Sequence, residues 1–251
     1  MHRMDVEIVG EGADLLLLHS LLSDRSSFAG IAKRLSAQRR LILVNLPGFG
    51  GAAPAEPLAG YVERIVEMLH DLKVPNTDIL GNGLGSFVAL KLAARDPSKV
   101  GRMVLLGAAT SFPEAGQQTF RALAEKVERE GMDAVADAAM ARMFPASFIA
   151  MAPSVIAERR EVFRGIDPNI FAAAARALAI LDLSPELDRI RSPVMVVVGE
   201  NDGATPPLLG RELAGRLPDA RMIELAGVGH APHIQAPDEL IAAISPFLGL
   251  R

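Results

Sequence analysis

Short apolar runs alternate along the chain with longer segments in which apolar residues recur every three or four positions. Several of the short runs, such as LLLL, LILV and VMVVV, are continuously apolar. Runs of this kind are typical of strands in a parallel sheet that is covered by helices on both faces. The predicted strands are Val6–Val9, Asp14–Leu18, Arg40–Val44, Asp78–Leu80, Met103–Leu106, Val194–Val198 and Arg221–Leu225.

The longer segments predict amphipathic helices between these strands, because their apolar residues fall on one side of a helix. Repeated alternation of strand and helix is typical of an α/β fold whose strands are joined by right-handed crossovers. The predicted helices are Ser26–Ser36, Tyr61–Leu72, Leu84–Arg95, Leu208–Leu217 and Ala236–Leu248.

The alternation stops between residues 111 and 183, where the pattern contains no convincing strand and prolines interrupt a helical period. Gly131–Phe144 and Asn169–Leu181 are the clearest helices of this segment. The sequence therefore predicts a sheet domain built from residues 1–110 and 184–251, with a helical domain, residues 111–183, inserted into it.

Composition narrows the range of functions. The chain has 251 residues, a formal net charge of −4 and no cysteine. The acidic balance argues against a nucleic-acid partner, and the lack of cysteine excludes disulfides, thiolate metal ligands and a cysteine nucleophile. No signal peptide is recognised, and no run approaches the roughly 18 to 20 apolar residues that span a bilayer. We therefore expect a cytoplasmic protein that acts on a small molecule and does not associate with a membrane.

The histidines do not show the clustered spacing of a metal site. We expect no metal and no cofactor. The histidines are His2, His19, His70, His230 and His233.

Active sites of parallel sheets gather at the carboxyl ends of the strands, so the loops there are the first candidates for a functional site. His19–Asp24 (HSLLSD) can present a backbone N–H to a reacting oxygen, although a plain strand-to-helix turn has the same pattern. Gly81, Gly83 and Gly85 alternate in GNGLG between a strand and a helix. That spacing fits the nucleophile elbow G-x-S-x-G with glycine in place of the nucleophile. The alternative is a structural glycine-rich turn.

A third candidate combines two loops after neighbouring strands. Asp202 follows the strand Val194–Val198, and His230 follows the next strand, 28 residues later. A carboxylate at this place can orient the imidazole and stabilise its protonated form. Glu200 is the alternative acid, and His233 is expected to hydrogen-bond locally or to pack rather than to react.

Together these segments resemble the α/β-hydrolase superfamily over nearly the whole chain. The loop NLPGFGGA at Asn45–Ala52 is similar to its D-x-P-G-x-G-x-S loop, and elbow, acid and histidine follow in its order. Within this superfamily, the sequence looks most like the 3-oxoadipate enol-lactonases. The similarity rests on HS in the first loop, on GMDAVADAAMARMF and on the pattern G-x-x-D-x-x-T-P-P. The resemblance implies an α/β-hydrolase fold, with a mostly parallel sheet, flanking helices and an inserted helical cap. It also implies an extra N-terminal strand for which no sequence signal is found.

The resemblance also assigns roles. His230 becomes the general base and Asp202 its orienting acid, while the backbone N–H groups of Leu21 and Leu84 form the oxyanion hole. Either Arg142 or Arg164 could meet a substrate carboxylate, although both could instead be solvated surface residues. The other candidate pocket residues beneath the cap are Ser20, Met140, Met143 and Phe144.

The main departure from the family pattern is Gly83, which offers no nucleophile. Neither Ser20, in the first loop, nor Ser86, one turn into the helix, replaces it easily. Three interpretations remain open. The glycine replaces a serine that was removed by design, or His230 activates water in a working hydrolase, or the protein binds ligands without turnover.

Overall fold

A seven-stranded sheet forms the centre of the computed structural model, which describes residues 4–251. Its strand order is β1-β3-β2-β4-β5-β6-β7; β1 is antiparallel to β3 and every other neighbouring pair is parallel. The strands are β1 (Asp5–Val9), β2 (Ala13–Leu18), β3 (Arg39–Asn45), β4 (Thr77–Asn82), β5 (Val100–Leu106), β6 (Val194–Gly199) and β7 (Ala220–Leu225). The predicted mostly parallel α/β sheet is confirmed.

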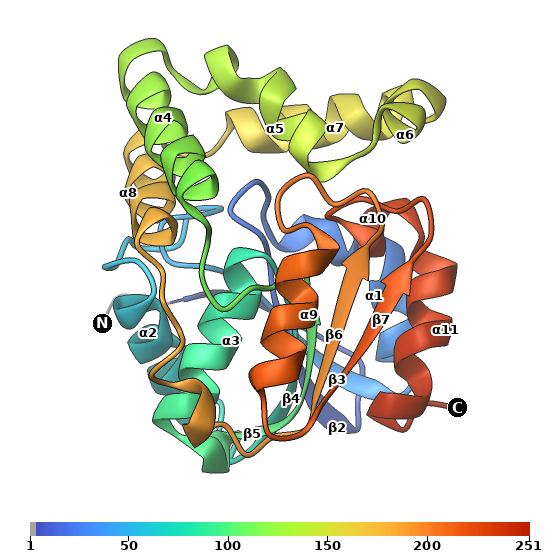
Figure 1. Cartoon of the computed structure of the whole chain (residues 1–251). Coiled ribbons are helices and arrows are strands. Elements are labelled where there is room, and N and C mark those ends of the chain that lie inside the picture. The colour runs from blue at the N-terminus through green and yellow to red at the C-terminus, as the bar shows by residue number, and fades with distance from the viewer. Residues whose placement is uncertain (1–3) are drawn as a thin grey trace.

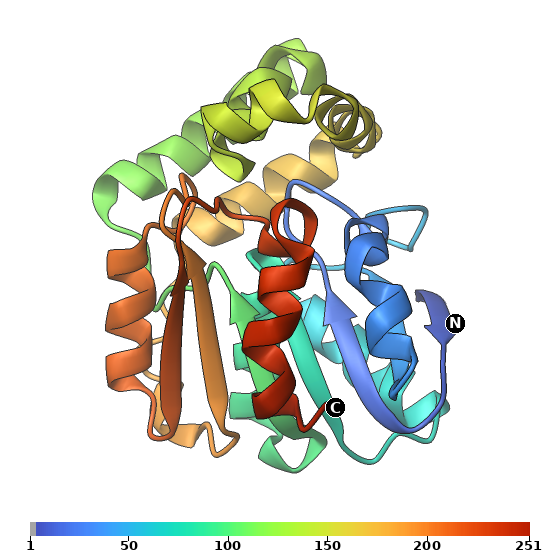
Figure 2. The same ribbon diagram turned by 90° about the vertical axis from the view of Figure 1, so that its right-hand side faces the viewer.

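Helices cover both faces of the sheet (Figures 1 and 2). In β2, Leu15 and Leu17 pack with α1 and α11, whereas Leu16 and Leu18 pack on the opposite face with α2 and α3. Both faces are buried, which explains why the strand sequences are continuously apolar. The covering helices are α1 (Ala29–Ser36), α2 (Ala59–Asp71), α3 (Leu84–Arg95), α9 (Pro207–Arg216) and α11 (Pro237–Leu248).

A layer of helices lies over the carboxyl ends of the strands (Figures 1 and 2). This helical layer comprises α4 (Glu114–Glu130), α5 (Ala136–Met143), α6 (Ala146–Met151), α7 (Pro153–Arg164) and α8 (Pro168–Ala179), all between β5 and β6. Its two ends are held together where it joins the sheet. Ser111 pairs with Asp182 in an isolated antiparallel bridge, and Leu183 N donates to Thr110 O at 2.9 Å.

Two predicted helices begin later than their apolar pattern indicates. The segment Ser26–Ser36 starts as a 3-10 turn, Arg25–Phe28, because the Asp24 side chain accepts from Ser26 N and caps it. The segment Gly131–Phe144 likewise starts as a 3-10 turn, Met132–Val135, before α5. The hydrophobic period continues through such turns, so it does not mark the boundary.

Within residues 4–251, no helix is both long enough and apolar enough to cross a membrane.

Candidate active site

The turn between β4 and α3 has the geometry of an elbow. Gly83 adopts φ 50° and ψ −112°, a conformation that side-chain-bearing residues rarely accept. The two flanking glycines are required by close packing. A Cβ on Gly81 would lie 2.7 Å from Ser86 N, and one on Gly85 would lie 2.1 Å from Leu18 O. Only glycine therefore lets the strand and the helix approach each other this closely.

The loops after β6 and β7 bring Asp202 and His230 together. His230 Nδ1 lies 2.9 Å from Asp202 Oδ2, and both side chains are almost completely buried. Asp202 Oδ1 also accepts from the backbone N–H groups of Ala204 and Thr205, which holds the carboxylate in place. When Nδ1 donates its proton to Asp202, His230 Nε2 carries the free lone pair of a base.

The imidazole of His230 lies between two glycines. A Cβ on Gly83 would lie 2.8 Å from His230 Nε2, and one on Gly107 would lie 2.5 Å from His230 Cε1. Asn82 Nδ2 donates to the carbonyl of His230 at 2.9 Å and so ties the histidine loop to the end of β4. Sequence analysis missed Gly107, Asn82 and Thr205. Only their position in the sequence could have indicated them, since all three lie at or beyond the carboxyl end of a strand.

Thr205 completes the hydrogen bonding around the pair. Its Oγ1 lies 3.2 Å from Asp202 Oδ2 and 3.1 Å from His230 Nδ1. The hydroxyl therefore contacts both partners and limits rotation of the imidazole.

Two backbone N–H groups are available at the elbow. Within residues 4–251, neither Leu21 N nor Leu84 N donates a hydrogen bond to another residue. The first loop is fixed beside the elbow, because Gly85 N donates to His19 O at 3.0 Å. This arrangement can receive a developing oxyanion.

His19 supports the first loop from beneath. Its Nε2 accepts from Leu46 N at 3.0 Å, and its Nδ1 lies 2.8 Å from Ser20 O. Complete burial lowers the pKa of His19 to about 4, so the ring is neutral and can make both contacts at neutral pH. The histidine of the HS motif is therefore a structural link between loops.

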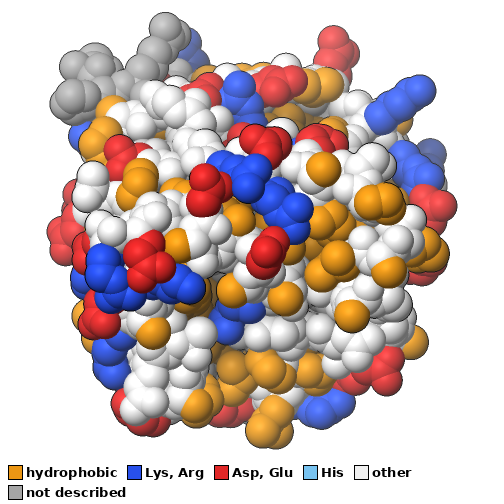
Figure 3. All heavy atoms as spheres, turned by 90° about the horizontal axis from the view of Figure 1, so that it is seen from above, with side chains coloured by type: hydrophobic (Ala, Val, Ile, Leu, Met, Phe, Trp, Pro, Cys, Tyr) orange, Lys and Arg blue, Asp and Glu red, His pale blue; other side chains and the backbone are white. Residues whose placement is uncertain are grey.

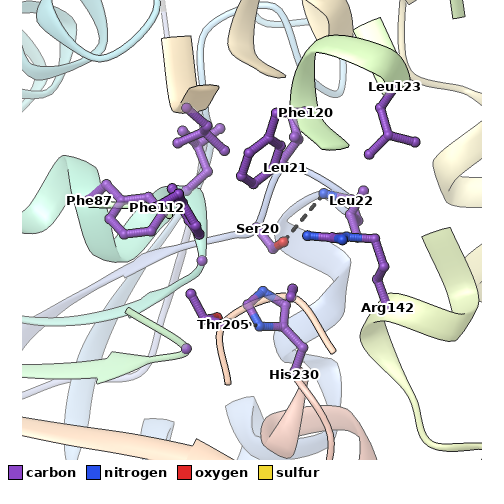
Figure 4. Close-up of a pocket in the computed structure, with 15 residues that line it drawn as sticks. Ser20, Leu21, Leu22, Phe87, Phe112, Phe120, Leu123, Arg142, Thr205 and His230 are labelled. Atoms are coloured by element: carbon purple, nitrogen blue, oxygen red, sulfur yellow. Dashed lines mark hydrogen bonds between the residues drawn. The ribbon is translucent and has the colours of Figure 1, made fainter. Parts of the chain in front are cut away.

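A small, mostly apolar cavity of about 30 Å³ adjoins the elbow (Figure 4). Ser20, Arg142 and His230 reach it from the first loop, from α5 and from the loop after β7. That volume holds on the order of two water molecules, so an ester can enter only if the helical layer or its side chains move. The apolar side chains that line it are Leu21, Leu22, Leu84, Phe87, Phe112, Phe120, Leu123, Leu178 and Ala204.

Three of the predicted pocket residues do not line this cavity. Met140, Met143 and Phe144 are about 1% exposed and pack in the core, with Phe144 against Phe148. Helical spacing identifies their buried face but does not say whether it meets a substrate or other side chains. Met143 acts through its backbone instead, since its carbonyl accepts from His230 N at 2.8 Å.

The structure separates the two predicted carboxylate-binding arginines. Arg142 lines the cavity, with its guanidinium carbon 5.5 Å from the centre of the Phe120 ring. Burial lowers the pKa of Arg142, and the negative charge of Asp202 opposes that shift. Arg164 does not line this cavity and forms ion pairs with Asp133 and Glu161.

The remaining candidates lie outside the His–Asp arrangement. Ser86 Oγ donates to Leu106 O at 3.1 Å, so its hydroxyl is engaged within the fold. Glu200 accepts from Gly227 N at 2.8 Å and is not the partner of the imidazole. His233 packs against Phe28, with ring centres 4.9 Å apart. No cluster of three or more metal-ligating side chains occurs in residues 4–251.

Elbow, acid and histidine follow one another along the chain in the order of α/β-hydrolases, on a sheet of that class. The molecule is thus a member of the α/β-hydrolase structural class whose elbow carries glycine. Residues 15–243 match the model of the Alpha/beta hydrolase family, and the chain belongs to that family. It is an enzyme of the hydrolase type with the α/β-hydrolase fold.

Similar proteins cover almost the entire chain. A pimeloyl-[acyl-carrier protein] methyl ester esterase from Aromatoleum aromaticum is 30% identical over 246 residues, covering 92% of this chain and 96% of that protein. A protein of the same name from Nitrosospira multiformis is 28% identical over 259 residues, covering 96% of this chain and 97% of that protein. The crystal structure of the enol-lactonase from Burkholderia xenovorans LB400 superposes with a TM-score of 0.93, and its sequence is 29% identical. The match covers 98% of this chain and 96% of the enol-lactonase chain.

Proposed function

We propose that the protein hydrolyses a small ester or lactone by using His230 to activate water beside Gly83. The observation that carries the proposal is the intact His230–Asp202 pair, whose free Nε2 faces a residue without a side chain. The names of similar proteins, methyl ester esterases and an enol-lactonase, support an ester or lactone as substrate. We also propose that residues 111–183 act as a cap over the core formed by 1–110 and 184–251.

The reaction needs one base and one oxyanion site. His230 Nε2 takes a proton from water while the oxygen of that water forms a bond to the carbonyl carbon. The N–H groups of Leu21 and Leu84 stabilise the negative oxygen, each by about 3 to 4 kcal/mol. The imidazolium then returns the proton to the leaving oxygen as the C–O bond breaks. An acid and an alcohol result, or a hydroxy acid from a lactone.

After His230, Ser20 is the next polar side chain beside Gly83. A Cβ on Gly83 would point between His230 Nε2 and Ser20 Oγ, at 2.8 and 3.1 Å. A water molecule beyond the Gly83 Cα can therefore be oriented from both sides. We infer that Ser20 positions the attacking water, whereas His230 removes its proton.

The test compares the protein with His230→Gln and, as a matched control, His70→Gln, whose histidine is exposed. We expect turnover of p-nitrophenyl acetate and of an enol-lactone that falls about 100-fold or more in His230→Gln only. Preincubation with an organophosphate should change neither the rate nor the protein mass, because position 83 has no hydroxyl.

Equal rates for the protein and for His230→Gln would refute the proposal. In that case a protein that binds ligands without turnover fits the pocket better. Stoichiometric labelling by the organophosphate, with loss of activity, would instead identify another nucleophile, and Ser20→Ala would then test the nearest hydroxyl.

A further inference from the structure

Arg142 differs from every other arginine of the helical layer. Within residues 4–251 its guanidinium forms no ion pair and donates no hydrogen bond, although it is partly buried in an apolar pocket. The other arginines of the layer each have an acidic partner, and Figure 3 shows positive and negative side chains adjoining on this face. These paired arginines are Arg121, Arg129, Arg159, Arg160, Arg164 and Arg176.

An unpaired, partly buried guanidinium is unfavourable for folding. It loses contact with water, and no carboxylate compensates the loss. The Phe120 ring faces the cation at 5.5 Å, but a ring face does not accept from the N–H donors at the edge of the guanidinium. Those donors therefore remain available to a molecule in the cavity.

The backbone holds Arg142 in a fixed place relative to His230. The carbonyl of Met143, the next residue, accepts from His230 N at 2.8 Å. A glycine allows this part of α5 to approach the histidine loop closely, because a Cβ on Gly229 would lie 2.6 Å from Met143 O. The backbone that carries Arg142 is thus held by a contact that also holds the His230 loop, and the Phe120 ring faces its guanidinium.

Figure 4 shows the Arg142 side chain turned into the cavity, on the side where Ser20 and His230 lie. A substrate whose reacting carbonyl lies at the elbow can extend through the same cavity toward this cation.

We propose that Arg142 binds a carboxylate carried by the substrate, so that the enzyme selects monoesters of short dicarboxylic acids over neutral esters of similar length. This inference rests on the proposed function and names its substrate class. A planar guanidinium can donate two parallel hydrogen bonds to a carboxylate, which a lysine cannot reproduce. The charge also rejects neutral analogues, because they would leave it buried and unpaired.

The kinetic test compares p-nitrophenyl hydrogen succinate with p-nitrophenyl butyrate, which has a similar length but no carboxylate. We expect kcat/KM to favour the succinate, and this preference to fall about 10- to 100-fold in Arg142→Gln through a higher KM. Arg142→Lys should recover only part of it. Arg164→Gln is the matched control, an arginine of the same layer that does not line the cavity, and it should keep the preference.

A binding test separates this inference from the proposed function. Monomethyl succinate and methyl butyrate are titrated calorimetrically into the protein, Arg142→Gln and Arg164→Gln. Binding of the anion that is lost only in Arg142→Gln supports the carboxylate site even if no substrate turns over. If turnover depends on His230 while the succinate is neither preferred nor bound more tightly, the proposed function stands and the carboxylate site is refuted.

The thermal midpoint provides a check on folding. Since Arg142 has no acidic or hydrogen-bonding partner to lose, Arg142→Gln should unfold at the same temperature as the protein or higher. A clear decrease would show that the guanidinium supports the fold, and it would contradict a role reserved for substrate.

Discussion

Replacing Gly83 by serine would add a hydroxyl beside His230 and would also strain the turn that has formed around glycine. The backbone at φ 50° costs a residue with a side chain about 1 to 3 kcal/mol. The new Cβ would lie 2.8 Å from His230 Nε2, about 0.6 Å inside the distance at which ordinary contact begins. The imidazole must therefore move while keeping its hydrogen bond to Asp202.

Gly83→Ala separates the two effects, because it adds the same Cβ without a hydroxyl. For a chain of this size we expect both variants to unfold about 2 to 12 °C below the protein, as measured by scanning calorimetry. Only Gly83→Ser should be labelled once by an organophosphate, detected as a mass increase. It should also hydrolyse p-nitrophenyl acetate about 100-fold faster than Gly83→Ala.

Two results would refute this reasoning. Thermal midpoints equal to that of the protein would show that the elbow is not strained by a side chain. A folded Gly83→Ser that is neither labelled nor faster would show that His230 cannot activate a hydroxyl at position 83. Labelling that persists in Gly83→Ser combined with His230→Gln would likewise exclude His230 as the base.

Three further predictions concern the surroundings of the base. Asp202→Asn should lower His230-dependent turnover on the order of 10³-fold in steady-state assays, because the amide can no longer fix the imidazole as the carboxylate does. Thr205→Val should lower it only about 3- to 10-fold, since the hydroxyl's contacts with Asp202 and His230 are lost while the His230–Asp202 hydrogen bond remains. Burial lowers the pKa of His233 to about 3, and the nearby positive charges of His230 and Arg159 add to this effect. Its neutral form therefore stabilises the fold fully above about pH 6.5, and this stability is lost as pH falls from there toward 3, by about 1.4 kcal/mol per pH unit. Urea unfolding measures the free energy of unfolding at pH 7.5 and at pH 5.0. Its decrease between these two pH values should be about 2 kcal/mol smaller in His233→Leu than in the protein or in His70→Gln.

The architecture was predictable because burial on both sheet faces leaves a direct record in the sequence. In β2, four consecutive leucines, Leu15–Leu18, serve two separate apolar clusters, one on each face. Short continuous apolar runs bounded by turns are typical of strands buried on both faces. Helix starts were less predictable, since the Asp24 cap and its 3-10 turn leave the hydrophobic period unchanged.

The site was predictable to the extent that its residues follow strands. Asp202 and His230 each come after a strand end, and neighbouring parallel strands bring such ends together. The pocket side chains were not predictable in this way. Met140 and Arg142 lie two positions apart on one short helix, and only the way α5 packs decides that the first is core and the second faces the cavity.

The sequence predicts an elbow without a nucleophile, and the proposed function requires that His230 stay oriented without one. The orientation of His230 depends on Asp202, on the Met143 carbonyl and on Gly107 against the ring, and none of these contacts involves a side chain at position 83. A serine at position 83 is therefore not needed to orient the imidazole. The base can therefore remain oriented without the nucleophile, and a water molecule needs only the same Nε2 and the same two N–H groups to react.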